Sequence, residues 1–440
     1  MMRKTSRHVL GVATAAVLSF FLVPTAGFAP IPAAHAAADG DAYSQLNLLG
    51  DVYERLKQEH VEKVDDKKLV EGAIKGMLEA LDPHSRYMDA KAWRDMQVTT
   101  SGSFGGIGIE ITSQDDLVQV VSPIDDTPAQ RAGVMSGDLI TQVDDKPLRG
   151  MTLEQASEAM KGPINSKVKL TIVRKGQDKP LELTLTREAI RVKSVSFRVD
   201  GDDVGYLRIA RFGEQTTSEL HKALTEIGKR VPAEKLSGYI LDLRNNPGGL
   251  LDQAVSVSST FMTRGEVVSI RGREASDMQR FTARGGDLTK GKPLVVLING
   301  GSASASEIVA GALHDHKRAT IVGTRSFGKG SVQTIMPLGE GKGALALTTA
   351  RYFTPSGRSI QALGIVPDIE VLQDVPAELK GQVDMQGEAS MPGHLSGDGE
   401  ERSGSQAYVP PDPKDDKALK TGLSLVRGTV SAKAKSAVAN

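Results

Sequence analysis

Residues 293–333 read PLVVLINGGSASASEIVAGALHDHKRATIVGTRSFGKGSVQ and decide the fold of the largest domain. The apolar run Leu294–Ile298 predicts a buried strand, which the following Asn-Gly-Gly ends. A helix follows the small residues Ser302–Ser306, and a second apolar segment, Ala319–Val322, leads into a glycine-rich turn that carries Lys329. Such a strand-turn-helix-strand unit is typical of an α/β fold and places backbone N–H groups and a hydroxyl at the end of a sheet.

Ser304 begins the predicted helix, and two interpretations of it are open. With Glu307 it has the S-x-x-E spacing of a capping box, in which the serine only caps the helix. Alternatively, it is a nucleophile at a helix N-terminus, where the helix dipole favours developing negative charge. Ser302 and Ser306 are rival nucleophiles, and this stretch alone favours the capping role.

A serine nucleophile needs a base, and Lys329 suits this role better than the histidines of the helix. His314 and His316 lie ten and twelve residues after Ser304, and ten residues span about 15 Å along a helix. Lys329 lies between two glycines, and a lysine removed from water can act as a base near neutral pH. In an extended segment Gln333 would share a face with Lys329, where its carboxamide could orient the amine.

Three motifs together resemble the carboxyl-terminal processing proteases, the S41 family of peptidases with a Ser/Lys dyad. SASASEI at 302–308 is followed by FGKGSVQ at 327–333, and GYILDLRNNPGGLL stands at 238–251. The resemblance covers roughly residues 40–370. Several motifs in the same order make it specific.

The resemblance implies a role for each matching residue. Ser304 would be the nucleophile, Lys329 the general base and Gln333 a supporting residue. One oxyanion donor would be the backbone N–H of Ala305. The other would come from Gly248 or Gly249.

The composition excludes several classes of function. The chain has 440 residues, with 54 Lys and Arg against 54 Asp and Glu, so no charge excess points to nucleic acid. It has no cysteine, which excludes disulfides, a cysteine nucleophile and thiolate metal sites. Hydrolysis through an acyl-enzyme needs neither a metal nor a cofactor, so we expect neither.

Residues 1–36 have the layout of a secretory signal peptide. Basic residues precede the apolar stretch Val9–Val23, and Ala34-His35-Ala36 is a small-x-small cleavage site. An uncleaved anchor is the alternative, but the apolar stretch is short for a full span. We therefore expect an exported protein of the periplasm or cell envelope, either free or membrane-associated.

Helical spacing of apolar residues predicts an N-terminal helical segment over 37–97. Its second helix ends at LDPHSRYM, residues 81–88, which is similar to the segment that links the N-terminal helices to the next domain in processing proteases. His84 lies in this segment. We interpret it as structural, because a lone histidine in a proline turn more often is.

Residues 98–187 resemble a PDZ domain placed before the protease domain. In such a domain, free N–H groups of a glycine-rich loop bind a terminal carboxylate, and the peptide adds as a strand to the sheet. The alternative is a glycine-rich hairpin in a small β domain. Arg131 is a candidate contact to the peptide or the catalytic domain, or a solvated surface residue. The predicted loop is Gly106, Ile107, Gly108 and Ile109, and the predicted apolar pocket is Ile107, Ile109 and Met160.

Alternating strands and helices predict a layered α/β protease domain over 188–372. Within it, Asp242 and Arg244 predict an internal ion pair. Residues 323–330 nearly spell a phosphate-binding P-loop, but the motif needs Ser or Thr where Gly330 stands. Residues 373–440 predict a flexible tail with one short helix over 412–427.

The sequence as a whole predicts a multidomain chain of mixed α/β and α+β class. We expect an exported serine endopeptidase whose PDZ-like domain binds accessible C-termini of protein or peptide substrates. The resemblance also allows an adaptor protein or self-association. The alternatives are an inactive scaffold that tethers C-termini and a different Ser/Lys amidohydrolase.

Overall fold

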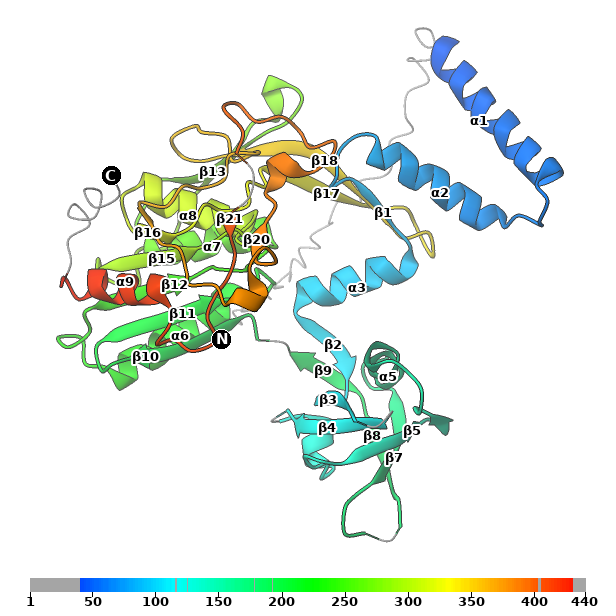
Figure 1. Ribbon diagram of the computed structural model, residues 1–440, viewed down its shortest axis with the longest axis horizontal. Helices are drawn as coiled ribbons and strands as arrows, with labels where there is room; N and C mark the ends of the chain where they lie inside the picture. Colours follow the sequence, from blue (N-terminus) through cyan, green and yellow to red (C-terminus); the bar gives the residue numbers. More distant parts are fainter. Residues whose placement is uncertain are drawn as a thin grey trace, which may run out of the picture. The chain divides into compact units, whose positions relative to one another are not determined.

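The structure is a computed structural model that describes residues 40–429 except 115–116, 125, 178, 192 and 403–404 (Figure 1). Contacts divide the chain into two units, with the boundary between Val70 and Glu71. The signal peptide predicted for residues 1–36 lies outside the described residues.

The first unit consists of helix α1 (Gly40–Glu59) and the start of α2 (Asp66–Glu79), as the helical spacing predicts. Lys57 near the end of α1 forms an ion pair with Asp66 at 3.2 Å. Several apolar side chains of α1 are exposed, among them Leu46, Leu49, Val52 and Leu56. Among the described residues, no helix combines the length and the apolar character that crossing a bilayer requires.

The predicted protease domain is built on a six-stranded sheet in the order β10-β11-β12-β15-β16-β19. β10 and β11 are antiparallel, and the pairs from β11 to β19 are parallel. The predicted strand of residues 294–298 is confirmed as β15. The bounds are β10 Val195–Asp200, β11 Val204–Ile209, β12 Gly238–Asp242, β15 Leu294–Ile298, β16 Thr320–Gly323 and β19 Ile369–Glu370.

Helices cover both faces of this sheet. Every residue of β12 and β15 is buried, because alternate side chains enter two separate apolar clusters. Three helices, α6 (Thr216–Arg230), α7 (Leu251–Phe261) and α8 (Ala305–Asp315), pack on one face. Helix α9 (Lys417–Val426) packs on the other face, where it contacts β12, β15 and β16.

The prediction of a flexible C-terminal tail is wrong for the described residues after 373. The short helix predicted over 412–427 is present as α9, but the segment before it also packs on the protease domain. Its short strands β20 (Asp384–Met385) and β21 (Ser405–Gln406) pair with each other, and Glu388 between them is fully buried. The physical reason is hydrogen bonding: Gln406 accepts from Gly300 and Thr324, and the N–H of Glu388 donates to Phe327, while α9 covers the second face of the sheet.

A second sheet, in the order β1-β18-β13-β14 with β17 paired to β18, carries the segment that follows Lys329. β17 begins at Ser331, two residues after the lysine, and the N-terminal LDPHSRYM segment joins the same sheet through β1. The bounds are β1 Arg86–Met88, β13 Glu266–Arg271, β14 Gln279–Thr282, β17 Ser331–Pro337 and β18 Ala344–Phe353.

The PDZ domain has its own apolar core and a sheet in the order β3-β4-β5-β7-β8, with β6 paired to β5. Helix α3 (Ala90–Ser101) precedes it. The strands that enter and leave the domain, β2 and β9, pair with each other, so both ends of the domain lie together. The bounds are β2 Ser103–Gly106, β3 Ile109–Gln114, β4 Leu117–Pro123, α4 Pro128–Arg131, β5 Leu139–Val143, β6 Lys146–Pro147, α5 Leu153–Met160, β7 Lys167–Val173, β8 Leu181–Thr186 and β9 Glu188–Arg191.

Candidate active site

Ser304 stands at the sharp turn between β15 and α8, in an unusual backbone conformation. Its φ of 54° and ψ of −113° lie outside the regions that non-glycine residues commonly adopt. The turn also lies tightly against Gly248, where an added Cβ would come within 2.9 Å of both the Ser304 Cβ and the Ala305 nitrogen. Glycine at 248 therefore lets the NNPGG turn approach the start of α8.

The structure separates Ser304 from its two rivals. Ser302 and Ser306 are fully buried, and their hydroxyls donate to the carbonyl oxygens of Leu243 and Asn246, at 2.8 and 2.9 Å. Ser304 is half-buried, and its hydroxyl donates to no acceptor among the described residues. Of the three serines, Ser304 therefore has the hydroxyl that an incoming carbonyl group could reach.

Glu307 joins the two predicted members of the dyad. Its Oε2 accepts the backbone N–H of Ser304 at 2.7 Å and that of Lys329 at 3.0 Å. Its Oε1 accepts the N–H of Gly328 and the hydroxyl of Ser326. One fully buried carboxylate thus brings together two backbone positions that are 25 residues apart in the sequence. The S-x-x-E spacing predicts only a helix cap, and the contacts of Glu307 with the Lys329 loop are not visible in it.

Burial changes the protonation of both charged groups in this region. It raises the pKa of Glu307 to about 7, although the Ser326 hydroxyl and the three N–H groups favour the carboxylate. Burial also lowers the pKa of the Lys329 amine, because the charged ammonium loses its water. A neutral amine near physiological pH is what a general base requires.

The loop around Lys329 has no free nest of N–H groups for a phosphate. Besides the contacts of Glu307, the N–H of Ser326 donates to Ile365 and that of Phe327 donates to Ser302. Gly330 donates to the side-chain oxygen of Gln361 at 3.0 Å. Since protein acceptors take consecutive N–H groups of this loop, the P-loop interpretation is excluded.

Gln333 lies on β17, and its amide nitrogen donates to Ser331 Oγ at 3.0 Å and to Thr348 Oγ1 at 3.2 Å. The Thr348 hydroxyl in turn donates to Asp82 Oδ1 at 2.9 Å, so the LDPHSRYM segment supports this side of the site. With its amide nitrogen engaged, Gln333 keeps its carbonyl oxygen as an acceptor.

The predicted ion pair of Asp242 and Arg244 is confirmed. The Arg244 guanidinium contacts Asp242 at 2.6 Å and also Asp416, just before α9, at 2.8 Å. All three side chains are buried. This cluster fixes the end of β12 and thereby the NNPGG turn that follows it.

The two glycines of that turn differ as oxyanion donors. The N–H of Gly248 donates to the side chain of Asn246 at 2.9 Å. The Gly248 carbonyl accepts the N–H of Phe212. This carbonyl and the N–H of Gly249 belong to the same trans peptide and point in opposite directions, so the N–H of Gly249 points away from Phe212. Neither this N–H nor that of Ala305 donates to an acceptor within the described residues.

His314 of α8 and His316 just after it lie apart from this arrangement, as expected. His314 contacts Asp315 and Asp368, and His316 contacts the carbonyl of Glu266 at 2.7 Å. Over the described part of the chain, no cluster of three or more His, Asp or Glu side chains could hold a metal ion.

Two N–H groups of the PDZ loop, those of Ile107 and Gly108, have no acceptor among the described residues. The carbonyls of Ile107 and Gly108 accept hydrogen bonds from within the domain, from the N–H groups of Ala129 and Ile124 at 2.9 Å each. The predicted pocket side chains Ile107, Ile109 and Met160 are part of the domain's apolar core or pack against it.

Arg131 is a surface residue of the PDZ domain. Its guanidinium forms an ion pair with Glu188 of β9, and both side chains are about half exposed. Of the roles considered for it, the structure places it in a surface pair within its own domain.

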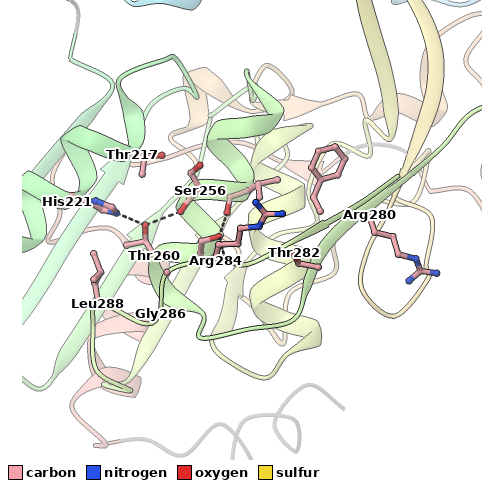
Figure 2. A pocket seen from close by; sticks show the side chains of 13 residues that line it. Thr217, His221, Ser256, Thr260, Arg280, Thr282, Arg284, Gly286 and Leu288 are labelled. Atoms are coloured by element: carbon pink, nitrogen blue, oxygen red, sulfur yellow. Dashed lines mark hydrogen bonds between the residues drawn. The ribbon is translucent and has the colours of Figure 1, made fainter. Parts of the chain in front are cut away.

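A groove of about 580 Å³ lies between α6, α7 and the segment after β14, and none of the predicted site residues lines it (Figure 2). His221 contacts the Thr260 hydroxyl at 2.9 Å, which resembles a base beside a nucleophile. However, this hydroxyl donates to the Ser256 carbonyl of its own helix, and the N–H of Arg284 donates to Ser259. The Thr260 hydroxyl thus bridges α6 and its own helix, which is a structural arrangement, and we assign no chemistry to this groove.

Three family models match consecutive parts of the chain. An N-terminal domain of the activating protease CtpB matches residues 29–92, a PDZ domain matches 105–185, and peptidase family S41 matches 203–371. This order confirms the predicted succession of an N-terminal segment, a PDZ domain and a protease domain.

Curated relatives match over most of the chain. A carboxy-terminal-processing protease of Bartonella bacilliformis is 55% identical over 393 residues, which cover 89% of this chain and 90% of the relative. The carboxy-terminal processing protease CtpA of Bacillus subtilis is 36% identical, covering 84% and 78%. Among solved structures, a photosystem II D1 C-terminal processing protease is 32% identical, covering 74% and 93%, with a TM-score of 0.43. The chain therefore belongs to the carboxy-terminal-processing proteases, serine peptidases of family S41, and carries a PDZ domain.

Proposed function

We propose that the protein is an exported serine endopeptidase in which Ser304 is the nucleophile and Lys329 the general base. The observation that carries this proposal is the buried Glu307 carboxylate, one oxygen of which binds the backbone N–H groups of both residues. The strained turn at Ser304 and its available hydroxyl support the same assignment, because such turns are found where strain serves a site.

The proposed reaction proceeds through an acyl-enzyme. The neutral Lys329 amine takes the hydroxyl proton while Ser304 Oγ bonds to the peptide carbonyl carbon. The resulting ammonium gives that proton to the leaving amine as the peptide bond breaks. Water, deprotonated by the same amine, then hydrolyses the ester and restores Ser304.

The oxyanion is best served by the N–H groups of Ala305 and Gly249. Both are free of protein acceptors in the described chain, whereas the N–H of Gly248 is held by Asn246. Each such donor contributes roughly 2.7–4 kcal/mol to the stability of the transition state. In this proposal the carbonyl oxygen of Gln333 accepts from the Lys329 amine and orients it.

The PDZ domain is proposed to select substrates by their C-termini. The free N–H groups of Ile107 and Gly108 suit a carboxylate, and the neighbouring apolar side chains suit an apolar last residue. An adaptor or self-association remains a prediction from the family resemblance.

Export is proposed from the signal-peptide layout of residues 1–36. Fusing these residues to a reporter that is active only outside the cytoplasm tests this. An inactive reporter in cells that process a known signal peptide would contradict export.

The central experiment compares the purified protein with its Ser304→Ala and Lys329→Ala variants on an unfolded polypeptide and on a free C-terminal peptide. We expect both variants to lose cleavage by at least about a thousandfold while peptide binding stays unchanged. Peptide binding without cleavage in the parent protein would instead identify a scaffold. Hydrolysis of small amides alone would identify another amidohydrolase.

A further inference from the structure

A hydrogen-bonded contact between His84 and Glu388 links an N-terminal and a C-terminal segment of the chain. Glu388, which lies between β20 and β21, is fully buried, and its two carboxylate oxygens contact Nε2 of His84 at 3.0 and 2.8 Å. The two residues are 304 positions apart in the sequence. His84 is itself held by its neighbours, because its N–H donates to Asp82 at 2.9 Å.

Glu388 also holds both ends of the Lys329 loop. Its backbone N–H donates to the Phe327 carbonyl at 3.0 Å. Its Oε1 accepts from Nε2 of Gln361 at 2.9 Å, and the Oε1 of Gln361 accepts the N–H of Gly330 at 3.0 Å. Phe327 and Gly330 flank the lysine, so this one residue ties down the loop on either side of it.

Charged groups from four parts of the chain act on the pKa of the Lys329 amine. They are Glu388 of the C-terminal segment, Arg86 of β1, Asp82 of the preceding turn and Glu307 of α8. Burial has the largest effect and lowers the pKa of the amine. Among the charges, Glu388 opposes this most strongly and raises the pKa, Arg86 lowers it, and Glu307 and Asp82 raise it.

We propose that Glu388 is a positioning residue for Lys329. Held by its contact with His84, Glu388 fixes both ends of the loop that carries the amine and adds a negative charge to its surroundings. The proposal rests on the proposed role of Lys329 as the base. It gives the C-terminal segment a part in catalysis without requiring any contact between Glu388 and substrate.

Two substitutions at position 388 separate its two effects. Glu388→Gln keeps the shape but removes the charge. We expect the acid limb of the pH profile of kcat/KM to move to lower pH by roughly 0.5–1 unit, since an amine without a neighbouring anion loses its proton more easily. Glu388→Ala removes the side-chain contacts to Gln361 and His84 while keeping the backbone contact to Phe327, and kcat should fall about tenfold or more with KM within about twofold.

Glu401→Gln is the matched control. Glu401 lies in the same segment and contacts a histidine, His394, at 2.9 Å, but it is not among the charges that act on the pKa of the Lys329 amine. In Glu401→Gln the acid limb of the pH profile of kcat/KM should stay at the same pH as in the parent protein. A merely structural Glu388 would lower the rate at every pH without moving the limb, and that result would overturn the proposal.

A second readout does not depend on turnover. In the Ser304→Ala background, acetylation of the Lys329 amine by acetic anhydride can be followed against pH by mass spectrometry. The midpoint should be lower with Glu388→Gln than without it, and equal midpoints would overturn the positioning role. Cleavage that survives Lys329→Ala would instead reject the proposed base, while the acetylation midpoint still decides on Glu388.

Discussion

The PDZ loop and the Lys329 loop are both glycine-rich, but they use their backbone N–H groups in opposite ways. In the PDZ loop the N–H groups of Ile107 and Gly108 are free in the described chain. In the Lys329 loop the N–H groups of Gly328 and Lys329 are bound by Glu307. One loop leaves two N–H groups without an acceptor in the described chain, as the proposed binding of a C-terminal carboxylate requires, whereas the other already holds a carboxylate of its own. The comparison teaches that a distant residue, and not the glycine pattern, decides what such a loop binds.

The largest expected effect tests the Lys329 loop, whose N–H groups are bound by Glu307. Glu307→Ala leaves three N–H groups and the Ser326 hydroxyl without their acceptor, so the free energy of unfolding of the protease domain should fall by about 3 kcal/mol or more. Urea unfolding measures this. Glu340→Ala, an exposed change in the same domain, is the control and should have an effect below about 0.5 kcal/mol. Equal losses in the two variants would break the comparison.

A smaller effect concerns pH. Because burial raises the pKa of Glu307 from 4.5 in the unfolded chain to about 7, the folded chain binds more protons between these values. The contribution of protonated Glu307 to the free energy of unfolding is therefore complete below pH 4.5 and is lost as the pH rises through 7. Relative to Glu307→Gln, the parent protein should lose on the order of 1–3 kcal/mol over this window.

Unfolding in urea at a series of pH values measures the difference between the two chains. Glu307→Gln is the reference because its amide does not titrate, so other groups cancel. A difference in the free energy of unfolding that stays constant between pH 4.5 and 7 would show that the pKa of Glu307, which binds the Lys329 loop, is ordinary.

The smallest effect tests the PDZ loop. In Gly108→Ala the new Cβ would lie 2.3 Å from the Thr127 side chain, at a φ of +79°. We expect about a tenfold loss of affinity for a C-terminal peptide, measured by calorimetry, with the protease domain unaffected. Gly133→Ala has a similar φ of +77° but open space around it, so it controls for backbone strain. Equal losses of affinity in the two variants would remove the loop from the comparison, as would equal binding of free and amidated peptides.

Local patterns predicted the parts of the site that lie close together in the sequence. The run Leu294–Ile298 gave β15, and the small residues after it gave the turn at Ser304. The ion pair of Asp242 and Arg244 followed from their position around a buried strand. These features depend on neighbouring residues, which is why the sequence was sufficient.

The remaining parts depend on contacts that no local pattern encodes. The pairing of His84 with Glu388 joins two polar segments at opposite ends of the chain, and each alone is typical of a turn or a linker. The error on the tail has a clearer cause. β15 is apolar at every position, and this already indicated that both faces of its sheet are covered. The second cover, α9, follows a long stretch rich in Gly, Ser and charge, which hid its structural role.

The backbone at Ser304 has a consequence for how this protein can change over time. A φ of 54° with a ψ of −113° disfavours any residue with a side chain, and glycine would relax it. The replacement that removes the hydroxyl most simply would therefore also relieve strain. Selection for stability alone would favour glycine at this position, so in the proposed mechanism the strain at Ser304 is a stability cost of keeping the nucleophile.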